Sequence, residues 1–214
     1  MFVGNMGANV INYIYHLIMG RLLGPISYGI LASLYSVLYI VSIIPSSASV
    51  SIVKFISSAK DDEVYSIYES IRKLIFKLAV ILSILTLFAS PFIARFLNIE
   101  NTMLVIFVVP ILFFSLVTLV NQSSSQGLLK FQGFVVPGLI SSLLKLLLGV
   151  AFVVIGWSVF GAMFAIVIGA VLSYLYSYKY IKKHIKITKI DKVNLKPFFK
   201  YSGPVLLQAL AFTS

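Results

Sequence analysis

Residues 134–155 read FVVPGLISSLLKLLLGVAFVVI, an apolar run with a single charged side chain, Lys145. A helix needs about 20 consecutive apolar residues to cross the hydrocarbon core of a bilayer. The run has that length, and the glycine-containing turn GWSVFG follows it. It therefore predicts a membrane-spanning helix, and similar runs on both sides of it decide the fold class.

Working outward, the chain of 214 residues shows apolar runs at about residues 2–20, 27–53, 74–97, 103–120, 134–155 and 159–181. They predict an all-α polytopic membrane protein with a six-transmembrane-helix bundle at residues 1–181. A basic cytoplasmic linker at 182–200 and the truncated start of a seventh transmembrane helix at 201–214 are expected to follow. Between the runs, residues 61–73 are predicted to form a short surface helix, and residues 121–133 are predicted to form a loop.

The composition excludes several classes of protein. Hydrophobic residues make up 60% of the chain and charged residues 11%, whereas soluble domains are about half apolar and about a quarter charged. A soluble globular, disordered or fibrous protein is therefore excluded. The chain has no cysteine and only two histidines, so thiol chemistry and a structural zinc site are excluded, and no cofactor is expected.

The basic residues predict how the bundle is oriented. Fourteen of the seventeen lysine and arginine residues fall at the same side of the predicted bundle. The exceptions are Arg21, Arg95 and Lys145. The positive-inside rule then places these basic segments and the N-terminus in the cytoplasm of a multi-pass plasma-membrane protein. We therefore interpret the formal charge of +11 as a sign of contact with anionic membrane lipids at the cytoplasmic face and not with nucleic acid.

Polar side chains recur along the first predicted span at Asn5, Asn9, Asn12 and His16. At about 100° per residue, spacings of four, three and four place them on one narrow stripe of the helix. Two interpretations remain open. The stripe either forms hydrogen bonds between helices or lines a hydrated pathway, and four polar groups in one row favour the pathway.

Lys145 gives the sharper indication of a functional site. It lies about 16 Å into its span at 1.5 Å per residue, where a lysine costs about 2.5–3.5 kcal/mol on insertion scales. All six acidic residues fall between the predicted spans, so no carboxylate within a span is available to pair with it. The expected partners are water in a cavity, backbone carbonyls or an anionic substrate. The alternative is a neutral lysine with a structural role.

Arg21 and Lys54 lie at the ends of predicted spans. Taken singly, each is expected to extend toward the lipid headgroups. Together with Lys145 they form a possible ladder of positive charge between the two faces of the membrane. A cavity of this kind suits an anionic cargo, with arginine holding a phosphate bidentately and lysine acting as a point charge.

Several stretches resemble a known family. They are GRLLGPISYGILASLYSVLYI (20–40), SVSIVKFIS (49–57), QGLLKFQGFVVPGLISSLLKLLLGVAFVV (126–154) and LKPFFKYSGPVLLQ (195–208). They are similar to the polysaccharide biosynthesis proteins, which are lipid-linked oligosaccharide flippases of the multidrug/oligosaccharidyl-lipid/polysaccharide exporter superfamily. The resemblance implies 12 to 14 helices in two six-helix lobes that rock around a central cavity. This chain is then expected to be the N-terminal lobe, completed by a C-terminal lobe or a second chain.

Four functions are weighed from these observations. The first is a flippase for an isoprenoid-pyrophosphate-linked oligosaccharide, with Arg21, Lys54 and Lys145 on the pyrophosphate and the polar stripe on the sugar. The second is a cation-coupled multidrug antiporter, which needs a buried carboxylate. The third is a non-transporting envelope-biogenesis subunit. The fourth, a membrane enzyme, is disfavoured because the chain lacks GxSxG, HExxH and P-loop motifs and shows no large outer loop.

Overall fold

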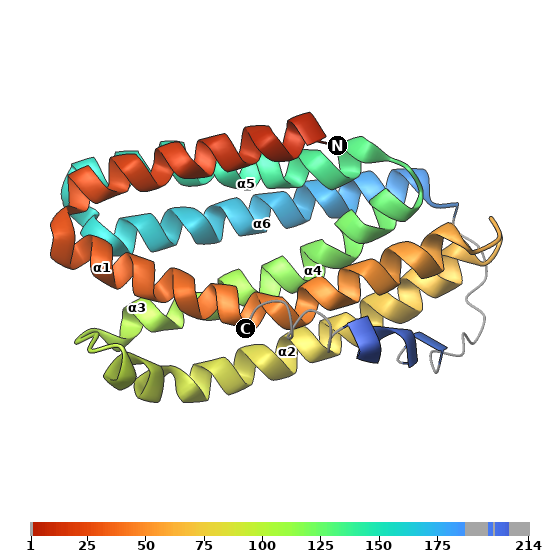
Figure 1. Ribbon diagram of the computed structural model, residues 1–214, viewed down its shortest axis with the longest axis horizontal. Coiled ribbons are helices and arrows are strands. Elements are labelled where there is room, and N and C mark those ends of the chain that lie inside the picture. Colours follow the sequence, from red (N-terminus) through yellow and green to blue (C-terminus); the bar gives the residue numbers. More distant parts are fainter. Residues whose placement is uncertain (1, 187–196, 199, 206–214) are drawn as a thin grey trace.

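The computed structural model describes residues 2–186, 197–198 and 200–205, with the side chains of residues 2, 3, 5 and 42–47 outside the description. Its elements are α1 (Phe2–Ser57), α2 (Val64–Phe96), α3 (Thr102–Ile106), α4 (Val108–Gly127), α5 (Phe131–Phe152), the π-helical segment η1 (Val153–Trp157) and α6 (Ser158–His184). These long helices run alongside one another (Figure 1). The described part is therefore an all-α bundle.

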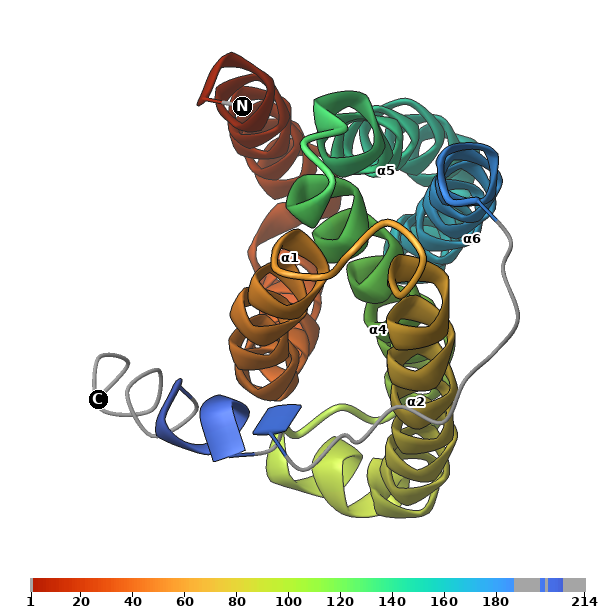
Figure 2. The same ribbon diagram turned by 90° about the vertical axis from the view of Figure 1, so that its right-hand side faces the viewer.

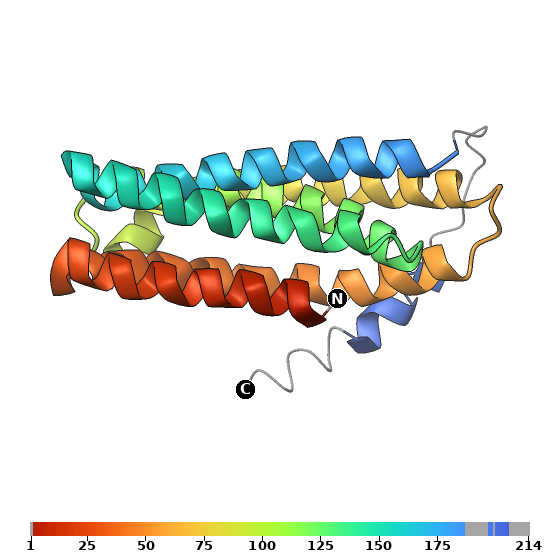
Figure 3. The same ribbon diagram turned by 90° about the horizontal axis from the view of Figure 1, so that it is seen from above.

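Two of the long helical stretches are hairpins. The stretches long and apolar enough to cross a bilayer are Met6–Val41, Val64–Phe96, Thr102–Gly127 and Phe131–His184. The chain reverses at Gly24, with φ 71° and ψ 174°, and at Gly156, with φ 103°. Figure 3 shows both reversals at the same end of the bundle. The described helices therefore make the six predicted crossings, and helix α1 consists of a first arm (residues 2–23) and a second arm (25–57).

Glycine is suited to these reversals because it has no Cβ and adopts positive φ without steric cost. Pro25 follows Gly24 directly, and proline favours the first positions of a new helix. The gap predicted between the runs 74–97 and 103–120 is confirmed as well. Helix α2 ends at Phe96, and the Asn101 side chain caps α3 by accepting a hydrogen bond from the Met103 amide at 3.0 Å.

Helix α4 lies at the centre of the bundle, as the end view shows (Figure 2), and contacts each of the other α-helices. One apolar cluster fills the end near the reversals and includes Met19, Leu34 and Val105. A second cluster fills the lysine-rich end and includes Ile56 and Leu116. Helix α4 is thus the central helix against which the other α-helices pack.

Two predictions about the connecting segments are wrong. Residues 64–73 do not form a separate surface helix, because α2 runs without a break from Val64 to Phe96. At 1.5 Å per residue its 33 residues extend about 50 Å, further than a hydrocarbon core of about 30 Å. Residues 121–127 do not form a loop but the last turns of α4.

The serines of that predicted loop, Ser123, Ser124 and Ser125, are buried. Next to them the fully buried Asn121 accepts a hydrogen bond from the Tyr68 hydroxyl at 2.8 Å and donates one to Ser177 at 3.1 Å. Helices α2, α4 and α6 are thereby joined by a polar contact inside the lysine-rich end. The run of polar residues at 121–126 reflects packing between helices rather than exposure to solvent.

Most of the linker predicted at 182–200 and residues 206–214 of the predicted seventh span lie outside the described residues. Residues 197–198 and 200–205 are helical, and the Phe198 ring packs against Phe55 of α1 at a centroid distance of 5.6 Å. The Ser202 hydroxyl donates to that of Ser51 at 2.8 Å, so this segment contacts the second arm.

Candidate functional site

A groove of about 730 Å³ opens between the two arms of α1 and helices α4, α5 and α6. It has a largely apolar wall with polar groups at intervals. Its polar lining residues are Asn12, His16, Tyr35, Ser36, Tyr39, Ser115, Ser141, Ser142 and Lys145. Among the described lining residues there is one ionisable cation other than histidine and no carboxylate. This groove is the candidate functional site.

Lys145 is brought to the groove by the close packing of α5 on the first arm of α1. A Cβ added at Gly149, one turn after Lys145, would lie 3.1 Å from the ring of Tyr15 and 3.2 Å from the end of Met19. The small residue therefore lets the two helices approach closely, as is usual between helices in membranes. The Lys145 side chain is then held between helices, with 9% of its surface exposed.

The partners of the Lys145 ammonium are aromatic rings. Its Nζ lies 4.6 Å from the ring centre of Tyr15 and 5.3 Å from that of Tyr35. A cation within about 6 Å of an aromatic face is attracted by the negative charge of that face, by about 2 kcal/mol or more where water is excluded. Aromatic rings were not among the partners predicted from the sequence. Their attraction explains how the lysine is tolerated without a carboxylate in the described lining of the groove.

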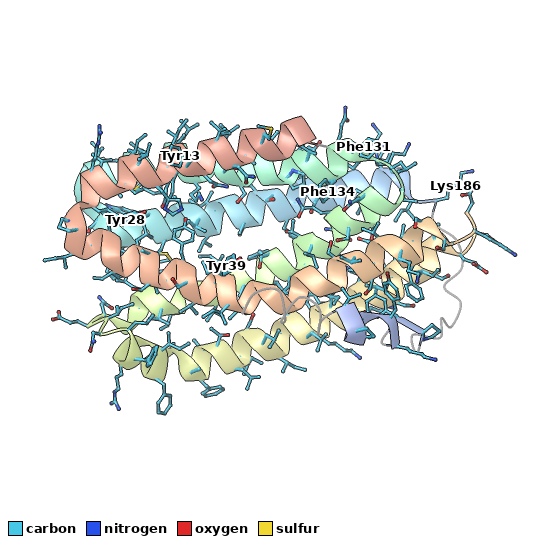
Figure 4. The ribbon with its side chains drawn as sticks, viewed as in Figure 1. Tyr13, Tyr28, Tyr39, Phe131, Phe134 and Lys186 are labelled. Carbon is cyan, nitrogen blue, oxygen red and sulfur yellow. The ribbon has the colours of Figure 1, made fainter. Side chains whose placement is uncertain are left out.

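These rings belong to a larger group that we call the aromatic cluster: Tyr15, His16, Tyr28 and Tyr35. The His16 ring lies edge-on to Tyr15 at 5.3 Å and to Tyr35 at 5.1 Å. Its Nδ1 is 3.2 Å from the Tyr28 hydroxyl. These contacts of His16 join the two arms of α1 across the hairpin. Of the tyrosines on the second arm, Tyr28 lies nearer the reversal than Tyr39 does (Figure 4).

The structure brings together only part of the predicted site. Asn12, His16 and Lys145 line the groove. Asn9 is exposed outside its described lining, and the side chain of Asn5 lies outside the described residues. Of the predicted polar stripe, Asn12 and His16 therefore line the groove, whereas Asn9 lies outside its described lining.

The two predicted end charges do not reach the groove. Arg21 is exposed near the reversal at Gly24. Lys54 is exposed at the opposite, lysine-rich end, where its Nζ lies 3.6 Å from the ring centre of Tyr201. The two residues and Lys145 lie at three different depths, but they do not share one cavity in this structure. A substrate-binding role for Arg21, Lys54, Asn5 and Asn9 remains a prediction.

The sequence of the whole chain matches the model of one protein family. The match is to "Polysaccharide biosynthesis protein" and extends over residues 1–213. The chain belongs to the polysaccharide biosynthesis protein family. No curated protein matches it.

Solved structures show the same fold for this member of the polysaccharide biosynthesis family. A proline-to-alanine mutant of MATE superposes with a TM-score of 0.80 at 18% identity, covering 99% of this chain and 52% of that one. MATE in the straight conformation gives a TM-score of 0.76 at 20% identity, with the same coverage. The chain therefore has the fold of about half of these longer proteins.

Proposed function

We propose that the chain is one lobe of an exporter that moves an isoprenoid-pyrophosphate-linked oligosaccharide across the plasma membrane. The observation that carries this proposal is the charge of the groove, in which Lys145 lies among amides and hydroxyls and the described lining holds no carboxylate. Membership of the polysaccharide biosynthesis family supports a saccharide cargo. The likeness in fold to MATE supports a two-lobed arrangement.

The groove offers both kinds of contact that such a cargo needs. Lys145 supplies a point charge for the pyrophosphate, and Asn12 and Ser141 offer hydrogen-bonding groups for sugar hydroxyls. The isoprenoid tail stays in the bilayer. Because no covalent bond changes, transport requires only that the cargo stabilise the inward-open and outward-open states differently. A second lobe, from the same or another chain, closes the groove in this proposal.

The lysine-rich end faces the cytoplasm in the same proposal. Lys60 and Lys130 lie in the turns at this end, and Lys182 and Lys186 lie near the end of α6. Figure 4 shows Lys186 at this end, away from the reversals. Clustered lysines are retained on the cytoplasmic side and attract anionic lipids there.

A cation-coupled multidrug antiporter is the second candidate. The specific observation in its favour is the likeness in fold to the MATE structures. It requires a membrane-buried carboxylate to bind the coupling ion, and among the described residues the groove offers none. This candidate therefore depends on a carboxylate supplied from outside the described groove.

Surface-polysaccharide output tests the flippase proposal. The full-length gene carrying Lys145→Ala is returned to cells that lack it, with Lys130→Ala as a matched control, since Lys130 is an exposed lysine at the start of α5. We expect output to fall at least about tenfold for Lys145→Ala, because removing a desolvated charge contact costs more than about 1.4 kcal/mol, and to be unchanged for Lys130→Ala. Protein levels in the membrane are measured alongside.

Arg21→Ala is tested in the same cells. Normal output with both Lys145→Ala and Arg21→Ala would remove the assigned anion-binding role. Normal output with Lys145→Leu would instead favour a non-transporting subunit, because a buried charge without a function is dispensable. Loss of drug resistance with intact polysaccharide output would favour the antiporter.

A further inference from the structure

A second cavity lies on α2, and none of its described lining residues lines the groove. Its volume is about 310 Å³, and it is lined by Arg72, Lys73, Phe76 and Lys77. Three of these four side chains are basic, and the fourth is an aromatic ring with 45% of its surface exposed. The cavity thus combines positive charge with an accessible apolar surface.

The depth of this cavity follows from the charges along α2. Arg95 follows Lys77 by eighteen positions along α2, and no charged residue lies between them. At 1.5 Å per residue this is about 27 Å, close to the hydrocarbon thickness of about 30 Å. The exposed apolar side chains of this segment include Ile81, Leu85 and Phe88. Lys73 and Lys77 therefore lie at the level of the lipid headgroups.

Arg72 is held in place from two sides. Its Nε and Nη2 both donate hydrogen bonds to Glu69 Oε2, at 3.1 and 2.9 Å. Its guanidinium also lies 5.9 Å from the ring centre of Tyr178 on α6. Lys182 contacts the same ring at 4.8 Å. The Glu69 carboxylate is buried beside Arg72. The exposed Lys73 and Lys77 therefore keep an excess of positive charge at the cavity.

We propose that this cavity binds the phosphate of an anionic phospholipid, with Lys73 and Lys77 contacting the phosphate and Phe76 contacting the glycerol and upper acyl chain. The position at headgroup depth selects a lipid phosphate over a phosphate ion from solution. Phe76 packs edge-on against Phe113 of α4 at a centroid distance of 5.6 Å. This contact holds the Phe76 ring in place at the cavity. The site does not depend on the transported cargo.

Native mass spectrometry of the full-length protein in detergent tests this proposal. The protein is titrated separately with phosphatidylglycerol and phosphatidylcholine. The test variant is Lys73→Gln with Lys77→Gln. The matched control is Lys179→Gln with Lys183→Gln, which removes two exposed lysines from α6. We expect phosphatidylglycerol binding to weaken about tenfold or more in the test variant, since each lysine near a lipid headgroup contributes about fivefold.

The control pair is expected to retain phosphatidylglycerol binding, and phosphatidylcholine is expected to bind weakly to every variant. Equal weakening in both pairs would overturn the proposal, because it would indicate diffuse attraction to a basic surface. Unchanged binding in the test variant would also overturn it. Displacement of the lipid by millimolar inorganic phosphate would assign the cavity to a soluble anion instead. Thermal unfolding of each variant shows that the changes leave the fold intact.

Discussion

Lys145 is stabilised in the bundle without an acidic partner among the described residues. Its ammonium lies within cation–π distance of Tyr15 and Tyr35. Such contacts contribute about 2 kcal/mol where water is excluded, against an insertion cost of about 2.5–3.5 kcal/mol. Neutral rings offset much of that cost without neutralising the charge. In the proposed function the lysine is therefore still able to attract an anion, which a buried salt bridge would prevent.

A double-mutant cycle at residues 15 and 145 separates this attraction from packing. We expect Tyr15→Leu to destabilise the purified protein more than Tyr15→Phe does, because phenylalanine keeps the aromatic face. Part of this difference, about 1–2 kcal/mol, is expected to vanish when Lys145→Met is also present. Denaturation in detergent measures the four stabilities. A coupling energy near zero would mean that the Tyr15 ring acts through packing alone.

The sequence revealed the charged and amide members of the groove but not the tyrosine rings next to Lys145. Lys145 is conspicuous because a charge in an apolar run is costly, and Asn12 and His16 follow from helical spacing. Tyr15 and Tyr35 lie in apolar runs where tyrosine is ordinary, and their meeting depends on the hairpin of α1. The adjacency of Tyr15 to the polar stripe was the available signal, but neighbouring residues point in different directions on a helix.

At the scale of the elements, bounds were predicted well where special backbone geometry ends a helix. Gly24 and Gly156 lie at positive φ, and their turns were visible as glycine-containing motifs. The predictions failed where polarity alone was taken as a sign that a span had ended. Residues 121–126 are polar because Asn121 and Gln122 form hydrogen bonds to neighbouring helices. Residues 64–73 are polar because α2 continues beyond the hydrocarbon core.

The approach of α4 to α1 depends on Gly127. A Cβ at this position would lie 2.9 Å from Cβ and Cγ2 of Ile56 and 3.0 Å from the Val53 carbonyl oxygen. We expect Gly127→Ala to destabilise the protein by about 1–3 kcal/mol through overpacking. Gly29→Ala is the control, since a Cβ there meets no atom within 4 Å. Thermal unfolding in detergent measures both, and equal stability of the two variants would contradict the tight contact.

At the scale of the whole molecule, the two ends of the bundle differ in charge and therefore predict its orientation. The α2–α3 connection, with Glu100, lies at the end near the reversals, whereas the α4–α5 connection, with Lys130, lies at the opposite end (Figure 1). Both side chains are exposed. The chain has no cysteine, so a single introduced thiol reports its own position in a full-length protein without other cysteines.

In intact cells, we expect a membrane-impermeant maleimide to label Glu100→Cys. We expect it to label Lys130→Cys only after the membrane is permeabilised, because basic connections are retained in the cytoplasm. The reverse pattern would invert the proposed orientation. It would also place the lysine-rich end, where the α2 cavity lies, in the outer leaflet. Labelling of both positions in intact cells would mean that the α3–α4 segment does not cross the membrane, against the continuous apolar stretch Thr102–Gly127. The leaflet in which the α2 cavity lies is thus decided together with the orientation of the bundle.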